Sequence, residues 1–263
     1  MNIHLTEAEF NELNKRVILT VRVGSELYGL NNKKSDSDLL SIYAAPVDNL
    51  HSLVQTHHQF QYKSNNTDYL LCSLQSFVRN IILGDSPLNF EALDSEAIRN
   101  HEDLSFLYNF RSNLNNYQLI KGYLGLARRD LKMFKKDKSS KKMFHCLRGF
   151  LTAKTLFGGK EYNNDFSSFT DQERLTLKLI KNDELPVVDL GVLADELSFK
   201  IDSFRKDLNE KLENNKIEKV MSLDKLSELD NWLINVSKKY AQSGRFQNMQ
   251  FLNSIQSDIE YNR

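Results

Sequence analysis

Two aspartates separated by one residue, Asp36 and Asp38, stand at the start of an apolar run. Side chains two positions apart on a strand point the same way, so both carboxylates can converge on one divalent cation. Ten residues separate Asp36 from Ser25, and an earlier apolar run ends at Gly24-Ser25. A Gly-Ser turn leaves backbone N–H groups and a hydroxyl free to hold phosphate. This combination is the outline of a site for nucleotide transfer.

A third carboxylate, Asp68, stands at the entry of another apolar run, over 69–74. It faces the other two aspartates if its strand lies beside theirs. Transfer of a nucleotidyl group commonly uses two metal ions about 3.5–4 Å apart, held by shared carboxylates. Oxygen ligands of this kind suit Mg²⁺ or Mn²⁺. We therefore predict that an NTP is the substrate, that Gly24 and Ser25 bind its phosphates, and that the catalytic and metal-binding residues are Asp36, Asp38 and Asp68.

Each of these signals has a plainer explanation when it is taken alone. A bare Gly-Ser pair is common, and Asp-x-Asp before a strand is more often a turn or a solvated loop. The segment 65–68 is also a plausible ordinary turn. The specific signal is the combination, in this order and with both motifs flanked by apolar runs.

Short strands and long helices must position these residues. Apolar runs rich in β-branched and aromatic residues predict strands over 17–23, 39–45 and 69–74, with a possible fourth over 59–62. A helix is predicted over 75–83, and the spacing of apolar residues is helical throughout from about residue 100. We predict two domains, 1–98 and 99–263, and further helices over 119–134, 141–157, 170–181, 190–213, 223–240 and 249–259.

The composition is that of an ordinary globular protein. Of the 263 residues, 40% are hydrophobic and 27% are charged, and the formal net charge is zero. Cys72 and Cys146 lack both metal-site spacing and the density of a disulfide framework. We therefore expect both to be buried thiols in a reducing cytoplasm. No apolar run approaches the ~20 residues needed to span a membrane, so we expect no membrane partner.

Positive charge is concentrated in one stretch, 121–160, which carries twelve Lys and Arg residues against two Asp residues. Aromatic residues are interleaved with these cations, as in surfaces that bind a phosphate backbone. The alternative is an ordinary solvated helix face. We predict that RNA binds through this stretch, on a patch formed by Arg128, Arg129, Lys132, Lys135 and Lys136.

Within the same stretch, Lys141, His145 and Arg148 fall at positions i, i+4 and i+7 of a predicted helix. Residues at this spacing share a helix face. We predict that they bind the NTP phosphates or stabilise charge that develops during transfer. In the alternative interpretation, His145 belongs to a local polar network and Arg148 pairs with an acid elsewhere.

These motifs resemble the nucleotidyltransferase signature of the DNA polymerase beta superfamily, and more narrowly its branch associated with RNA-repair operons. The resemblance covers roughly 17–200 and includes Gly24-Ser25, the Asp36/Asp38 pair, Asp68-Tyr69 and the Lys141–Arg148 segment. One departure is Ser37, where the superfamily often has an apolar residue. The resemblance implies an α+β fold, in which a small mixed β-sheet is followed by an all-helical domain that forms the other wall of the cleft.

The resemblance also implies metal-dependent transfer of an NMP from an NTP to a hydroxyl. The basic stretch favours RNA as the acceptor, either a tRNA or a broken RNA 3′ end. Two alternatives stay open. One is nucleotidylation of a protein or small molecule, and the other is a catalytically silent, antitoxin-like interaction module.

Overall fold

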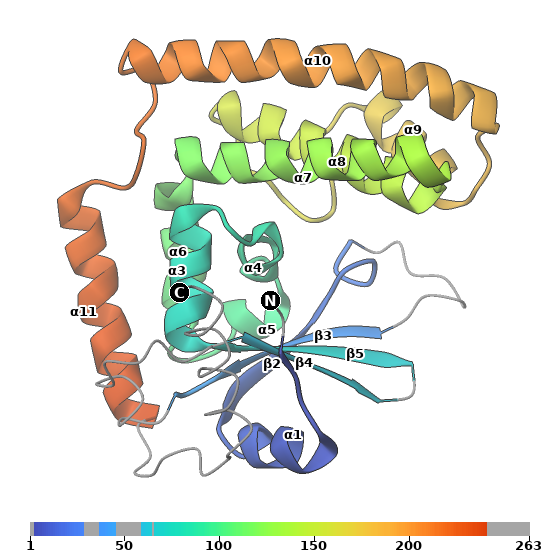
Figure 1. Ribbon diagram of the computed structural model, residues 1–263. Coiled ribbons are helices and arrows are strands. Elements are labelled where there is room, and N and C mark those ends of the chain that lie inside the picture. The colour runs from blue at the N-terminus through green and yellow to red at the C-terminus, as the bar shows by residue number, and fades with distance from the viewer. Residues whose placement is uncertain (1–2, 29–36, 46–58, 65, 241–263) are drawn as a thin grey trace, which may run out of the picture. The chain divides into compact units, whose positions relative to one another are not determined.

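The computed structural model describes residues 3–28, 37–45, 59–64 and 66–240 (Figure 1). They belong to two compact units, each built from separate segments of the chain. The sheet unit comprises 1–23, 36–79 and 227–263, and the helical unit comprises 24–35 and 80–226. These units divide the chain differently from the predicted domains, 1–98 and 99–263, which stay a prediction.

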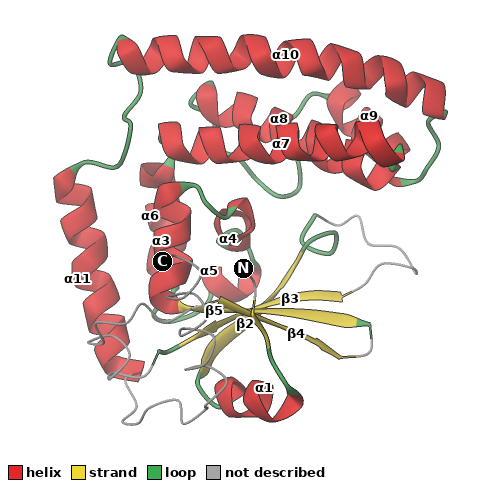
Figure 2. Ribbon diagram, viewed as in Figure 1, coloured by secondary structure: helices red, strands yellow, loops and turns green. Residues whose placement is uncertain are grey.

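The sheet unit contains a five-stranded mixed sheet with the order β1-β4-β5-β3-β2 (Figure 2). Strand β3 lies between β2, which is antiparallel to it, and β5, which is parallel to it. Strand β4 is antiparallel to β5, and β1 is parallel to β4. The strands are β1 (Ile3–His4), β2 (Val17–Val23), β3 (Ser37–Tyr43), β4 (Gln59–Ser64) and β5 (Thr67–Ser73).

Helix α1 (Glu7–Asn14) covers one face of this sheet. It begins in a capping box in which Thr6 accepts from the Glu9 backbone N–H and the Glu9 carboxylate accepts from Thr6 N–H. Leu13 of the helix is buried with Tyr43 and Phe60 of the strands, and Phe10 packs against this core. Burial of these large apolar side chains is what holds the helix on the sheet.

Helices make up most of the remaining chain (Figure 1). In the helical unit, the long α7 packs against both α8 and α10, and α8 also contacts α9 and α10. Residues 146–153 of α8 are all buried. A helix that is covered on every side forms the core of its unit. The helices are α3 (Leu74–Leu83), α4 (Pro87–Ala92), α5 (Glu96–Arg99), α6 (Ser105–Phe110), the 3₁₀ helix η1 (Arg111–Leu114), α7 (Tyr117–Asp137), α8 (Ser140–Phe157), α9 (Asp171–Lys181), α10 (Val187–Glu213) and α11 (Leu223–Tyr240).

Two glycines allow a close backbone crossing inside the helical unit. Gly84 has φ +67°, and a Cβ on it would lie 2.2 Å from the carbonyl oxygen of Gln118. A Cβ on Gly122 of α7 would lie 2.1 Å from the carbonyl oxygen of Gly84. Because no real Cβ tolerates such distances, glycine is needed at both positions.

The predicted α+β fold is confirmed: a small mixed sheet is followed by a long helical region. Each predicted strand and each predicted helix from 75 to 240 is present, with its ends shifted by a few residues. Helix α8 ends at Gly158 and Gly159, and Gly159 has φ +70°, a conformation common after the last turn of a helix. The predicted helix over 249–259 lies outside the described residues. Within the described ranges, no helix combines the length and apolar character that crossing a membrane requires.

Candidate nucleotidyltransferase site

Asp38 and Asp68 lie side by side in the sheet unit, near the N-terminal ends of the neighbouring parallel strands β3 and β5. The register of β3 and β5 pairs Asp38 directly with Asp68. Residues paired across adjacent strands point to the same face of a sheet. The strand carrying Asp68 therefore lies beside the strand carrying Asp38, which is the condition under which the two carboxylates face each other. The roles of the two residues stay a prediction.

A lysine extends this row of charged residues. Lys63 on β4 is in register with Asp68, and its Nζ lies 2.9 Å from Asp68 Oδ1. Both side chains are substantially exposed, at 61% for Lys63 and 46% for Asp68. An ion pair open to solvent contributes little stability. Asp68 can therefore exchange its cationic partner at small cost.

Asp36, the other member of the predicted Asp-x-Asp pair, lies outside the described residues. The described ranges contain no group of three or more His, Cys, Asp or Glu side chains that could hold a metal. Asp38 and Asp68 still supply carboxylate oxygens from paired positions of two strands. That donor set fits Mg²⁺, which commonly uses one or two protein carboxylates together with substrate phosphates.

Gly24 and Ser25 begin a turn immediately after β2. Gly24 has φ +68°, a conformation that costs glycine nothing and that other residues adopt reluctantly. The residue before it, Val23, is in register with Asp38. The predicted phosphate-binding turn therefore directly follows the β2 residue that is paired with Asp38 of β3.

On α8, the three predicted nucleotide-binding residues lie at different depths. Lys141 is exposed, His145 is partly buried and Arg148 is fully buried. Burial, followed by the positive charges of Arg148 and Lys141, lowers the pKa of His145 to about 3. The imidazole is therefore neutral at pH 7, and one of its ring nitrogens is a hydrogen-bond donor.

Arg148 lies in the interior of the helical unit, where its guanidinium forms an ion pair with Glu91 of α4. Its Nη1 also donates to the hydroxyl of Tyr28, at 2.8 Å. The Tyr28 hydroxyl donates in turn to Glu91 Oε2, and the hydroxyl of Tyr123 donates to Glu91 Oε1 at 3.2 Å. Arg148 and Glu91 thus form a buried, charge-balanced cluster with Tyr28.

The predicted RNA-binding patch lies on exposed positions of α7. Arg129 pairs with Asp130 at 3.4 Å, and Lys135 pairs with Asp195 at 3.6 Å. Three other patch residues have no ion pair within 4.0 Å in the described part of the chain: Arg128, Lys132 and Lys136. Their charges remain available to a polyanion.

Sequence reasoning assigned no role to three of these residues, Lys63, Glu91 and Tyr28. For Glu91 a signal was present, because it is a single charge inside the apolar run Phe90–Leu93. A buried charge of that kind requires a partner of opposite sign. The apolar run around Glu91 does not identify this partner, because Arg148 lies 57 residues away in the sequence.

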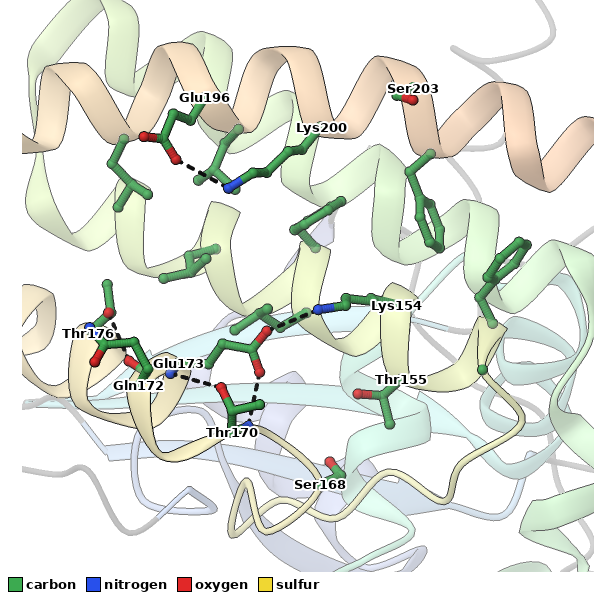
Figure 3. A pocket seen from close by; sticks show the side chains of 18 of the residues that line it. Lys154, Thr155, Ser168, Thr170, Gln172, Glu173, Thr176, Glu196, Lys200 and Ser203 are labelled. Atoms are coloured by element: carbon green, nitrogen blue, oxygen red, sulfur yellow. Dashed lines mark hydrogen bonds and ion pairs between the residues drawn. The ribbon is translucent and has the colours of Figure 1, made fainter.

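The helical unit also contains a cavity of about 950 Å³ between α8, α9 and α10. Ion pairs line two of its sides: Lys154 with Glu173 at 3.2 Å, and Lys200 with Glu196 at 3.1 Å (Figure 3). Its apolar lining includes Phe150 and other side chains from α8 and α10. The predicted site residues that the structure describes do not line this cavity, so it does not support the predicted chemistry.

Comparison with known protein families identifies the family of this chain. Residues 2–235 match the sequence profile of the RNA repair pathway DNA polymerase beta family. The chain belongs to this family. The resemblance predicted from the Gly24-Ser25 and Asp36/Asp38 motifs is thereby confirmed, and with it a polymerase beta-like nucleotidyltransferase assignment.

Other comparisons add little to this family assignment. A search of curated proteins gives no match. A structure search finds the crystal structure of a nucleotidyltransferase-like protein from Exiguobacterium sibiricum 255-15, with 13% sequence identity. The match covers 94% of this chain and 82% of that chain, with a TM-score of 0.30. A TM-score this low does not establish a common fold.

Proposed function

We propose that this member of the family transfers a nucleoside monophosphate from an NTP to an acceptor hydroxyl, with Asp36, Asp38 and Asp68 as its catalytic carboxylates. The observation that supports this most is the register of β3 and β5, which sets Asp38 directly beside Asp68. Family membership supports the same class of reaction. A carboxylate beside the acceptor hydroxyl also favours its deprotonation.

Mg²⁺, or Mn²⁺ in its place, is the cation that we propose for these three carboxylates. When bound, two such ions supply charge neutralisation for the triphosphate and activation of the acceptor hydroxyl. Lys63 keeps a positive charge 2.9 Å from Asp68 before any substrate arrives. The exposed position of that ion pair makes the carboxylate accessible for exchange.

The chain's own phosphate ligands are proposed to be the backbone N–H groups and hydroxyl of the Gly24-Ser25 turn, with Lys141 as an exposed cation. Backbone N–H groups in a tight turn form a concave site for anions. The neutral His145 can contribute a hydrogen bond, and its lowered pKa makes it a weak base at pH 7. These residues would orient the triphosphate for in-line displacement.

RNA is the acceptor that we propose. The family description names an RNA repair pathway. The exposed cations of α7 form the kind of surface that neutralises a phosphate backbone. We propose a tRNA or a broken RNA 3′ end, whose terminal hydroxyl would receive the nucleotide.

The function is tested by label transfer with the full-length protein. The protein is incubated with Mg²⁺ or Mn²⁺, total RNA and each of the four α-labelled NTPs in turn. We expect label in RNA from one or more NTPs. Transfer should fall roughly 100-fold or more in the Asp36→Asn/Asp38→Asn variant, which loses charge with little change in volume.

A matched control removes two exposed carboxylates of α11, in an Asp224→Asn/Asp230→Asn variant. It should transfer label as the wild type does. Label on a protein or small molecule in place of RNA would favour the alternative acceptors and overturn the RNA proposal. Absence of label with every NTP and both metals would overturn the transfer reaction and favour a silent interaction module. Full activity in the Asp36→Asn/Asp38→Asn variant would exclude the carboxylate mechanism.

A further inference from the structure

The turn that carries Gly24 and Ser25 ends in a deeply anchored residue. All of 24–28 is described, and Gly24 to Leu27 are partly exposed while Tyr28 is 6% exposed. Three residues of extended chain span only about 10 Å. If the position of Tyr28 is fixed, Ser25 must therefore lie within about 10 Å of it.

Tyr28 is fixed by contacts on several sides. Its hydroxyl donates to Glu91 and accepts from Arg148 Nη1 at 2.8 Å. The guanidinium of Arg148 also lies 4.5 Å from the centre of the Tyr28 ring. The ring stacks on Phe166 with a centroid distance of 5.4 Å. The residue is thus held through its hydroxyl and through both its cationic and its aromatic neighbours.

The charged partners of Tyr28 are themselves immobilised. Glu91 is 1% exposed and Arg148 is 5% exposed, and each compensates the charge of the other. Tyr123 of α7 also donates to Glu91. Glu91 accepts hydrogen bonds from Arg148 and from two tyrosine hydroxyls, whereas the buried Nε of Arg148 has no hydrogen-bond partner among the described residues. Hydrogen bonds among buried charged groups favour one arrangement, because the loss of a partner in a low-dielectric interior is costly. Helices α4, α7 and α8 are therefore tied together at the point that receives Tyr28.

We propose that Tyr28, Glu91 and Arg148 act as positioning residues that hold the Gly24-Ser25 turn in the conformation that binds the NTP phosphates. This inference rests on the proposed function, since it takes the turn to be the phosphate site. It assigns Arg148 a role through Tyr28, in place of direct contact with a phosphate. The cluster is preorganised, so the turn has little freedom to lose when an anion binds.

The test uses Tyr28→Phe in the full-length protein, because this change removes the hydroxyl and keeps the buried ring. Tyr117→Phe is the matched control: its hydroxyl donates to Asn209 at 3.0 Å in the same unit, outside the cluster. Amide hydrogen exchange over 24–27 is measured without nucleotide, together with global stability in urea. We expect exchange over 24–27 to accelerate about tenfold in Tyr28→Phe and to stay unchanged in Tyr117→Phe.

The second readout is kinetic, and it separates positioning from folding. For the NTP that the wild type transfers, KM should rise about tenfold in Tyr28→Phe while kcat stays within a factor of about three. Arg148→Lys, which keeps the charge, should fall between the wild type and Arg148→Met in KM. A merely structural role would lower the amount of active enzyme and leave KM unchanged.

These readouts distinguish failure of this inference from failure of the proposed function. Unchanged exchange over 24–27 in Tyr28→Phe would overturn the inference, whether or not the protein transfers nucleotides. Accelerated exchange with an unchanged KM in an active enzyme would also overturn it. If the wild type transfers no nucleotide, the proposed function fails. In that case the inference that the turn is held for NTP phosphates fails too. The exchange result then decides only whether the cluster of Tyr28, Glu91 and Arg148 holds the turn.

Discussion

Asp68 in the sheet unit and Glu91 in the helical unit are both carboxylates paired with a cation, yet their surroundings are opposite. Asp68 faces Lys63 at a strand end that is open to solvent. Glu91 is enclosed with Arg148 among helices α4, α7 and α8, and it accepts from two tyrosine hydroxyls. The same pair of charge types therefore occurs in two different environments.

The difference follows from the cost of changing partners. At an exposed site water replaces a lost partner, so the carboxylate can release lysine and accept another cation. In the interior, the loss of one partner leaves an uncompensated charge in a low-dielectric medium. Exposed charges in this protein are therefore suited to binding ligands, whereas buried charges are suited to fixing the structure.

Matched carboxylate-to-amide changes test this contrast directly and carry the largest expected effect on stability. Glu91→Gln should lower the free energy of unfolding by about 3–5 kcal/mol, because Arg148 would stay buried without its counter-charge. Asp68→Asn should change the same quantity by less than about 0.5 kcal/mol. Urea denaturation of both variants provides the measurement. Equal losses in the two variants would contradict the contrast.

His145 sharpens the comparison, because partial burial and the neighbouring positive charges lower its pKa to about 3. The unfolded chain takes up this proton near pH 6.5, whereas the folded protein takes it up only near pH 3. Stability from this group is therefore complete above about pH 6.5. It should fall as the pH drops toward 3, by up to about 1.4 kcal/mol per pH unit.

Urea midpoints at pH 7 and pH 5 check this expectation. His145→Gln cannot take up the proton, so its midpoint should change less between these two pH values than that of the wild type. An identical pH dependence in the two proteins would show that His145 titrates normally in the folded state. The usual pKa values of aspartate and glutamate lie below pH 5, so a change in stability between pH 5 and pH 7 comes chiefly from histidine.

The exposed cations of α7 should have the smallest effect on stability and a large effect on RNA binding. An Arg128→Gln/Lys132→Gln/Lys136→Gln variant should unfold within about 0.5 kcal/mol of the wild type. Its affinity for a labelled tRNA should fall, and the slope of log affinity against log salt should become shallower by about 2 for a single-stranded contact region. The matched control is Lys216→Gln/Lys219→Gln, which changes exposed lysines elsewhere in the same unit. A wild-type affinity that does not vary with salt would exclude this surface.

The sequence alone predicted the elements well, because their signals are local. Apolar runs rich in β-branched and aromatic residues located β2, β3 and β5 to within a few residues, and helical apolar spacing did the same for the long helices. The capping box of Thr6 and Glu9 is a further local feature, since all of its atoms lie within four residues. The sequence placed Asp38 and Asp68 each at the entry of a strand, and the register of β3 and β5 supplied their pairing.

The depth of Arg148 was not predictable in the same way. Its spacing from Lys141 and His145 is correct for a shared helix face, yet burial depends on what packs around α8. That packing is supplied by α7, α9 and α10, and the periodicity of α8 does not specify how these helices surround it. The partner of Arg148 comes from α4, and the residue that both hold comes from the turn after β2. Such convergence is a property of the tertiary fold, which helix periodicity does not encode.

The interleaving of the two units has a practical consequence for dissecting this protein. The chain passes from one unit to the other after Val23, Ser35, Arg79 and Leu226. No single cut can release either unit as an intact fragment. A fragment spanning 80–226 would retain Glu91 and Arg148 and lack Tyr28, so it would expose an interior cavity where a tyrosine ring belongs. Circular permutation or a tethered peptide carrying 24–35 would be needed to obtain the helical unit on its own.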